Sequence, residues 1–80
     1  MRTVAIAIFP GVQALDVAGP VDVFAEANQF LPPDERYQVT LLSAESGAVR
    51  ASNGMALLAD VTFERAGHAF DLALVAGGPA

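Results

Sequence analysis

Residues Ile6–Phe24, IAIFPGVQALDVAGPVDVF, contain the strongest sequence signals for the fold of this chain. It continues an apolar run, Val4–Phe9, of the kind found in parallel strands that are covered on both faces. Pro10-Gly11 stops the run. Gly19-Pro20 is a typical helix start, because proline fits the first helical position, where its missing N–H costs nothing. The stretch therefore predicts a strand, a loop that carries Asp16, and a helix that starts at Pro20.

The predicted helix covers residues 20–28 and ends before Pro32-Pro33. Asp22, Glu26 and Gln29 recur at i, i+4 and i+7 and form one polar stripe along it. Apolar residues occupy the rest of the helix surface. An apolar arc of this width is typical of a helix that packs on a sheet.

Further extended segments follow the helix. Residues 37–43 (YQVTLLS) and 71–76 (DLALVA) are rich in β-branched and apolar residues, which favours strands. Between these two strands, Asn53-Gly54 is a strong hairpin signal, because this dipeptide suits a tight turn. The hairpin strands are predicted at residues 49–51 and 55–59.

The order of elements predicts the topology. One helical turn is expected at residues 62–66, and the alternation of strands with helices implies a mostly parallel sheet with right-handed crossovers. In the flavodoxin-like order, strand 4–9 is central and lies between strands 37–43 and 71–76. The predicted fold class is α/β, a flavodoxin-like open parallel sheet sandwiched by helices. These residues form its first part, with a β-hairpin insertion.

This topology brings two distant segments together. The loop with Asp16 leaves the carboxyl end of strand 4–9, and Gly77-Gly78 leaves the carboxyl end of strand 71–76. Open α/β sheets bind ligands at this edge, where the chain changes direction. We therefore expect Asp16 to lie beside Gly77-Gly78.

Two interpretations remain open for each of these candidates. Asp16 could bind a nucleophile or a substrate, or it could be a loop acid that caps the helix. Gly77-Gly78 could present backbone N–H groups to an anion or an oxyanion, or could simply end the strand. His68 has no acid or nucleophile at a useful spacing, so we expect a solvated surface side chain.

Composition excludes several classes of function. There is no cysteine, which excludes disulfides, thiolate metal sites and a cysteine nucleophile within these residues. We expect no cofactor and no metal. The net charge is −5, with no basic patch for a phosphate backbone, so any DNA binding requires another part of the protein. No apolar run is long enough to span a membrane and no signal peptide is evident, so a cytoplasmic location is expected.

Strand 71–76 also bears on domain organisation. Its apolar residues face both sides, and it would lie at an open edge of the sheet. Natural domains cover long apolar edges, because such edges promote aggregation. We therefore expect the 80 residues to be the first part of a larger domain.

Three segments carry a resemblance to a known family: FPGVQALDVAGPVDVFAEAN, YQVTLLSAESGAVRASNGMALLAD and DLALVAGGP. Together they resemble the PfpI-type branch of the class I glutamine amidotransferase-like superfamily. The resemblance is closest to the N-terminal domains of AraC-type transcriptional regulators. It implies that residues 1–80 are the N-terminal part of one such domain, truncated before the nucleophile elbow.

The resemblance also implies roles for the candidate residues. In the enzymes of the superfamily, a cysteine on a later strand-to-helix elbow is the nucleophile. An acid at the position of Asp16 hydrogen-bonds that cysteine, and backbone groups like those of Gly77 and Gly78 line the pocket. In the regulators, the domain senses a small metabolite, often one that contains nitrogen, and need not be catalytic.

We favour a ligand-sensing domain of an AraC-type regulator. Its expected partners are a small-molecule metabolite and a second copy of the protein in a homodimer. DNA would be bound only through a C-terminal helix-turn-helix domain, and no membrane is involved. The alternative is an isonitrile hydratase-like or amidase-like hydrolase that uses Asp16 and a downstream cysteine. A flavodoxin is disfavoured, because residues 10–18 contain no Ser or Thr to hold a phosphate.

Overall fold

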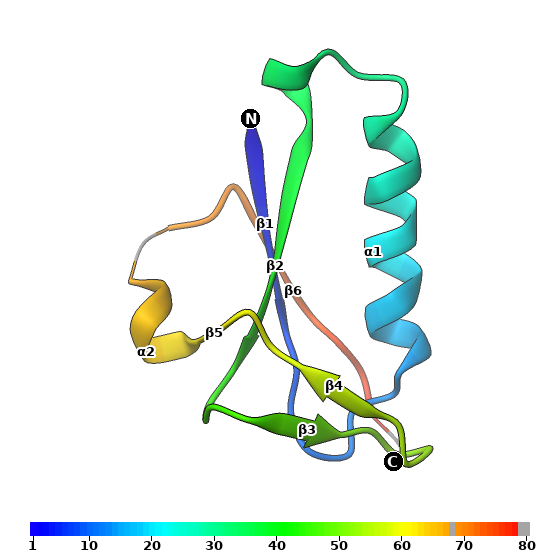
Figure 1. Cartoon of the computed structure of the whole chain (residues 1–80), viewed down its shortest axis with the longest axis vertical. Helices are drawn as coiled ribbons and strands as arrows, with labels where there is room; N and C mark the ends of the chain where they lie inside the picture. The colour runs from blue at the N-terminus through cyan, green and yellow to red at the C-terminus, as the bar shows by residue number, and fades with distance from the viewer. Residues whose placement is uncertain (68, 79–80) are drawn as a thin grey trace.

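The computed structural model describes residues 1–67 and 69–78 and contains one main sheet, one long helix and a small hairpin (Figure 1). The predicted surface residue His68 lies outside the described residues. In chain order the elements are β1 (Arg2–Ala7), α1 (Leu15–Asn28), the 3₁₀ helix η1 (Pro33–Glu35), β2 (Tyr37–Ser43), β3 (Ala48–Arg50), β4 (Ala56–Leu58), β5 (Val61–Thr62), α2 (Phe63–Ala66) and β6 (Leu72–Val75).

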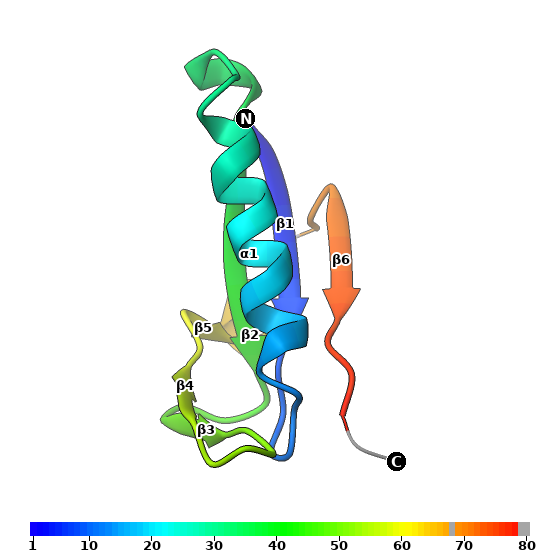
Figure 2. The same cartoon turned by 90° about the vertical axis from the view of Figure 1, so that its right-hand side faces the viewer.

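The main sheet is parallel, with the strand order β5-β2-β1-β6. β1 is central, and its residue Val4 lies opposite Val39 of β2 and Leu72 of β6. α1 covers one face of β1 and β2, and the short α2 lies on the other side of the sheet (Figures 1 and 2). The predicted α/β class and flavodoxin-like arrangement are confirmed.

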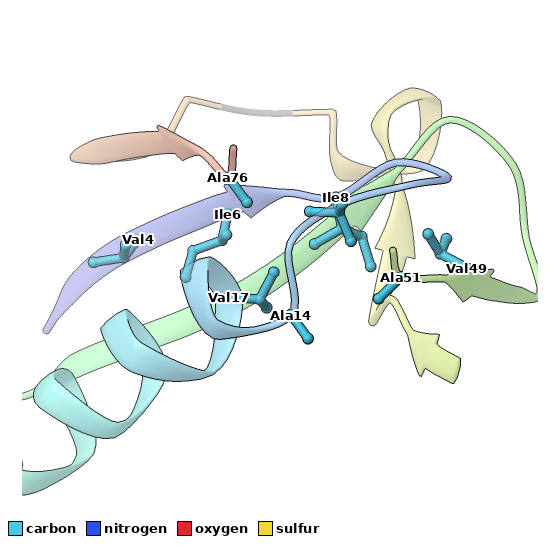
Figure 3. Close-up of a cluster of buried hydrophobic side chains, with 9 residues drawn as sticks. Val4, Ile6, Ile8, Ala14, Val17, Val49, Ala51 and Ala76 are labelled. Atoms are coloured by element: carbon cyan, nitrogen blue, oxygen red, sulfur yellow. The ribbon is translucent and has the colours of Figure 1, made fainter. Parts of the chain in front are cut away.

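The core lies between the sheet and α1 (Figure 3). Alternate residues of β1 and the segment after it, Val4, Ile6 and Ile8, are 0–1% exposed and belong to this core. Ala5, on the opposite face of the strand, is also buried, so the centre of β1 is covered on both faces. The other buried members of the cluster come from the following loop, α1, the hairpin and the end of β6: Val12, Ala14, Val17, Val49, Ala51 and Ala76. Residues distant in the chain therefore share one core.

α1 begins at Leu15, so the predicted start at Pro20 is wrong. The reason is tertiary: Val17 is 3% exposed and lies in one stripe with Val21 and Phe24, which pack against the core. Burial of Val17 offsets the loss of one backbone hydrogen bond at Pro20, whose missing N–H would otherwise donate near the start of the helix. Asp16 consequently lies in the first helical turn and not in a loop.

The predicted strands differ from the observed ones mainly at their ends. β1 ends at Ala7, but the next residue stays attached to the sheet, because the Ile8 N–H donates to the Leu42 carbonyl at 2.8 Å. β2 covers the predicted residues 37–43. β5 was not predicted, since its two residues carry no strand pattern of their own and form a strand only by pairing with β2.

The predicted hairpin is confirmed as the antiparallel pair of β3 and β4. Its turn contains Gly54, whose φ of +89° is a conformation that favours glycine. Two backbone bonds join the hairpin to the loop after β1: the Gly11 N–H donates to Arg50 and the Ser52 N–H donates to Val12, at 2.9 and 2.8 Å. The hairpin therefore supports that loop.

The strands β1, β2 and β6 begin at one edge of the sheet, called here the amino edge, which is closed by side chains. The Asn28 amide accepts from the Tyr37 N–H at 2.8 Å and donates to the Tyr37 carbonyl at 2.9 Å. This pair of bonds attaches the end of α1 to the start of β2.

A second clamp at the amino edge joins the starts of β1 and β6. The Asp71 carboxylate accepts from the Thr3 N–H at 2.8 Å and from the Thr3 hydroxyl at 3.2 Å, while the Asp71 N–H donates to that hydroxyl at 3.1 Å. The bond from the Thr3 backbone, aided by the one from its hydroxyl, lowers the pKa of Asp71 below its ordinary value.

Within residues 1–67 and 69–78, no helix is long and apolar enough to cross a membrane.

Candidate functional site

The candidate site lies at the carboxyl edge, where β1, β2 and β6 end. Here the segment after β1 runs beside the segment after β6 (Figure 2). The Gln13 N–H donates to the Gly77 carbonyl at 2.8 Å, and the Ala76 N–H donates to the Ala7 carbonyl at 3.3 Å. About sixty residues of chain therefore separate two segments that are hydrogen-bonded neighbours, as the topology requires.

Asp16 lies at this junction. One of its carboxylate oxygens, Oδ2, accepts from the Gly77 N–H at 3.2 Å. Asp16 therefore lies beside Gly77, as the topology predicted, while its role in a site stays a prediction. Asp16 does not cap the helix: Ala14 occupies the N-cap position of α1, and no side-chain capping bond is present there among the described residues.

Gly77 is in close contact with Asp16. A Cβ placed on Gly77 would lie 2.7 Å from Asp16 Oδ2, which is closer than two such atoms approach. A Cβ on Gly78 would instead meet the Gly11 carbonyl oxygen and the Phe9 ring, each at 3.3 Å. The two glycines therefore have different neighbours, and the Gly77 N–H is already bound to a carboxylate.

Asp16 and Gly77 line a hollow of about 310 Å³. The other residues that line it are apolar: Leu15, Pro20, Leu74, Val75 and Ala76. Asp16 is exposed, so its carboxylate is accessible from solvent. The hollow is at the small end of the range for ligand sites, which are mostly apolar with a few polar groups. Within the hollow, the Asp16 carboxylate can accept a hydrogen bond from a small molecule.

A second cavity, of about 600 Å³, was not predicted from the sequence. Val75 lines both cavities. The larger one is mostly apolar, with Phe9, Val49 and Phe63 in its wall and Glu45 as its only charged residue among those described. Because its wall comes from the ends of β1, β2 and β6 together with β3 and α2, no local sequence pattern could have predicted it.

The described residues contain no group of three or more His, Cys, Asp or Glu side chains that could hold a metal ion. The chemistry available in the smaller hollow is that of the Asp16 carboxylate, the Gly77 peptide and apolar walls.

Comparison with known proteins places this geometry in context. Residues 2–80 match the DJ-1/PfpI family. A Streptomyces lividans protein described as an uncharacterized protein in the cpoL 5′ region is 42% identical over 77 residues. That match covers 96% of this chain and 52% of the Streptomyces protein, so the chain spans about half the length of this curated relative.

Solved structures share the fold. An AraC family transcriptional regulator from Pseudomonas putida superposes with a TM-score of 0.82 at 24% identity, over 99% of this chain and 48% of the regulator. A DJ-1 superfamily protein from Salmonella typhimurium has a TM-score of 0.80 at 28% identity, over 99% of this chain and 40% of that protein. Drosophila melanogaster DJ-1beta has a TM-score of 0.79 at 23% identity, over 96% of this chain and 38% of its own.

Proposed function

Because the chain belongs to the DJ-1/PfpI family, we propose that it forms the N-terminal part of a small-molecule-sensing domain in an AraC-type transcriptional regulator. DNA binding is assigned to a helix-turn-helix region outside these 80 residues. The ligand is a small metabolite bound at the carboxyl edge of the sheet.

One observation carries this proposal: Asp16 and Gly77 meet in an accessible hollow between the start of α1 and the carboxyl end of β6. In open α/β sheets this is where ligands bind, because the crossovers leave a crevice between neighbouring strands. An exposed carboxylate surrounded by apolar side chains provides both orientation and contact area for a small molecule.

Two further observations favour a regulator. The Pseudomonas putida protein, whose fold matches nearly the whole chain, is a transcriptional regulator of the AraC family. The net charge of −5 opposes contact between these residues and the DNA backbone, which is consistent with a sensing role for this part of the protein.

A cysteine-dependent hydratase or hydrolase is the second candidate. Asp16 uses only Oδ2 in a bond to the described residues, so Oδ1 could accept from a thiol. The neighbouring Salmonella protein was crystallised as a variant in which a cysteine is replaced by alanine. This chain contains no cysteine, so the nucleophile would come from outside these residues.

DNA binding by the full-length protein tests the regulator. We expect it to bind the DNA upstream of its own gene, and we expect one member of a panel of nitrogen-containing metabolites to change that affinity. Asp16→Ala should remove the response to the metabolite. Asp22→Ala is the matched control, because Asp22 is another exposed acid on α1 that does not line the hollow. The proposal is wrong if the full-length protein does not bind DNA specifically.

Turnover tests the alternative. If the full-length protein hydrates isonitriles or hydrolyses amides, Asp16→Asn should abolish the activity, because the neutral amide cannot act as the acid partner of a thiolate. Turnover that survives Asp16→Asn unchanged would exclude a catalytic role for Asp16.

A further inference from the structure

We propose that Gly77 is the positioning residue of Asp16, and that the pair makes the hollow selective for ligands that donate a hydrogen bond. This inference rests on the proposed function and specifies the class of ligand. Gly77 holds Asp16 Oδ2 and leaves Oδ1 as the acceptor for an N–H or O–H group of the ligand.

The first argument is the pattern of backbone bonds around Gly77. Its carbonyl accepts from the Gln13 N–H at 2.8 Å, and its N–H donates to Asp16 Oδ2 at 3.2 Å. Residues 13–16, which face Gly77, form a turn in which the Asp16 N–H donates to the Gln13 carbonyl at 3.0 Å. Both polar groups of Gly77 are thus bound to one short turn, which fixes the position of Asp16 relative to β6.

The second argument is steric. Gly77 does not have a positive φ, unlike Gly11, Gly47, Gly54 and Gly67. Its backbone conformation therefore does not require glycine. A Cβ would, however, lie 2.7 Å from Asp16 Oδ2, so the carboxylate at the end of this side chain would have to move away and give up its bond to the Gly77 N–H. The effect of a side chain at this position therefore depends on the carboxylate, and removing the carboxylate tests it.

The third argument concerns the ligand. Among the described residues that line the hollow, Asp16 is the only charged one. The Gly77 N–H is bound to it and is not available to an anion. A carboxylate or phosphate ligand would meet an acceptor without a compensating donor, whereas an ammonium or an amide N–H would form a charge-assisted hydrogen bond. The site therefore selects small amines or amides over anions.

A double-mutant cycle tests the positioning role. Gly77→Ala is expected to lower the melting temperature of the protein, and Asp16→Ala is expected to remove most of that decrease, because the colliding oxygen is gone. Gly78→Ala is the matched control: it should have the same effect with or without Asp16, since its neighbours are Gly11 and Phe9. Equal effects of Gly77→Ala in both backgrounds would overturn the proposal.

Nuclear magnetic resonance of ¹⁵N-labelled protein gives a readout that a purely structural glycine would not. Asp16→Asn should shift the Gly77 amide resonance, because it replaces the carboxylate that this N–H binds, whereas Asp22→Asn should leave the resonance in place. Ethylammonium and acetamide should then perturb the Gly77 resonance in the wild type and not in Asp16→Ala. The same perturbation by acetate, with none by the two donors, would overturn the assigned ligand class.

These outcomes separate the inference from the proposed function. A Gly77 resonance coupled to Asp16 in a protein that neither binds DNA nor responds to metabolites would retain the positioning role and reject sensing. A metabolite response without coupling between Gly77 and Asp16 would retain sensing and reject the positioning role.

Discussion

The amino and carboxyl edges of the sheet use similar polar side chains in different ways. At the amino edge, Asn28 makes two bonds to Tyr37, and one oxygen of Asp71 accepts two bonds from Thr3. At the carboxyl edge, Asp16 accepts one bond of 3.2 Å, and its Oδ1 has no partner among the described residues. Asp71 likewise has no partner for its Oδ1 among the described residues, so the two acids differ in the number of bonds that each accepts. Under the proposed function, the spare oxygen of Asp16 is the one that a ligand would use.

Hollows occur at both edges, since one of about 320 Å³ is lined by Thr3 of the amino-edge clamp. The hollow lined by Asp16 and the larger cavity lined by Phe63 lie at the carboxyl edge, beside the loop that the hairpin supports. The backbone bonds between the hairpin and that loop hold the loop in position and leave the hollows beside it open. Substitutions at Ile6, Asn28, Asp71 and Asp16 test this difference between the two edges, and their expected effects on stability decrease in that order.

Ile6→Ala should have the largest effect, because Ile6 is 0% exposed and lies in the central strand that joins both edges. The cavity left behind should lower the free energy of unfolding by about 2–5 kcal/mol. Urea denaturation monitored by circular dichroism measures this change. A loss below about 1 kcal/mol would mean that the two edges do not share one core.

Asn28→Ala should be the most damaging change at the amino edge. It leaves the part-buried N–H and carbonyl of Tyr37 without their partners, which should cost about 2 kcal/mol. Gln29→Ala is the control, because Gln29 is exposed and makes no side-chain bond in the described structure. Ligand binding at the carboxyl edge should be unchanged in both variants, as competition binding would show.

Acidification should weaken the clamp between β1 and β6. The pKa of Asp71 is lowered in the folded state, so the unfolded state binds more protons and stability rises with pH. The contribution of Asp71 is therefore complete above the ordinary aspartate pKa of about 3.9 and is lost as the pH falls through the lower folded value. Urea midpoints measured against pH should show a smaller acid-induced loss in Asp71→Asn than in the wild type. Identical pH profiles would show that the Thr3 clamp does not stabilise the fold.

Asp16→Ala should have the smallest effect on stability. It removes one exposed bond, and we expect a change within about 0.5 kcal/mol, as for most surface substitutions. A large loss in urea denaturation would show that Asp16 is a structural residue like Asn28. In that case the contrast between the two edges would disappear.

Local sequence signals predicted much of the fold. Asn53-Gly54 predicted the hairpin, and the apolar runs predicted β1, β2 and β6. The contact of Asp16 with Gly77 followed from topology alone. The start of α1 did not follow, because the burial of Val17 on the sheet outweighs the helix-start pattern at Gly19-Pro20. The Asn28–Tyr37 pair and the larger cavity also depend on tertiary contacts, which leave no local pattern.

One measurement tests the contrast between the two edges most directly: the melting temperature of the full-length protein with and without the metabolite that stabilises it most. We predict that Asp16→Ala melts near the wild-type temperature but loses the metabolite-induced rise. Asn28→Ala should melt lower and keep that rise. An undiminished rise in Asp16→Ala, or no rise in the wild type with any metabolite, would contradict the account.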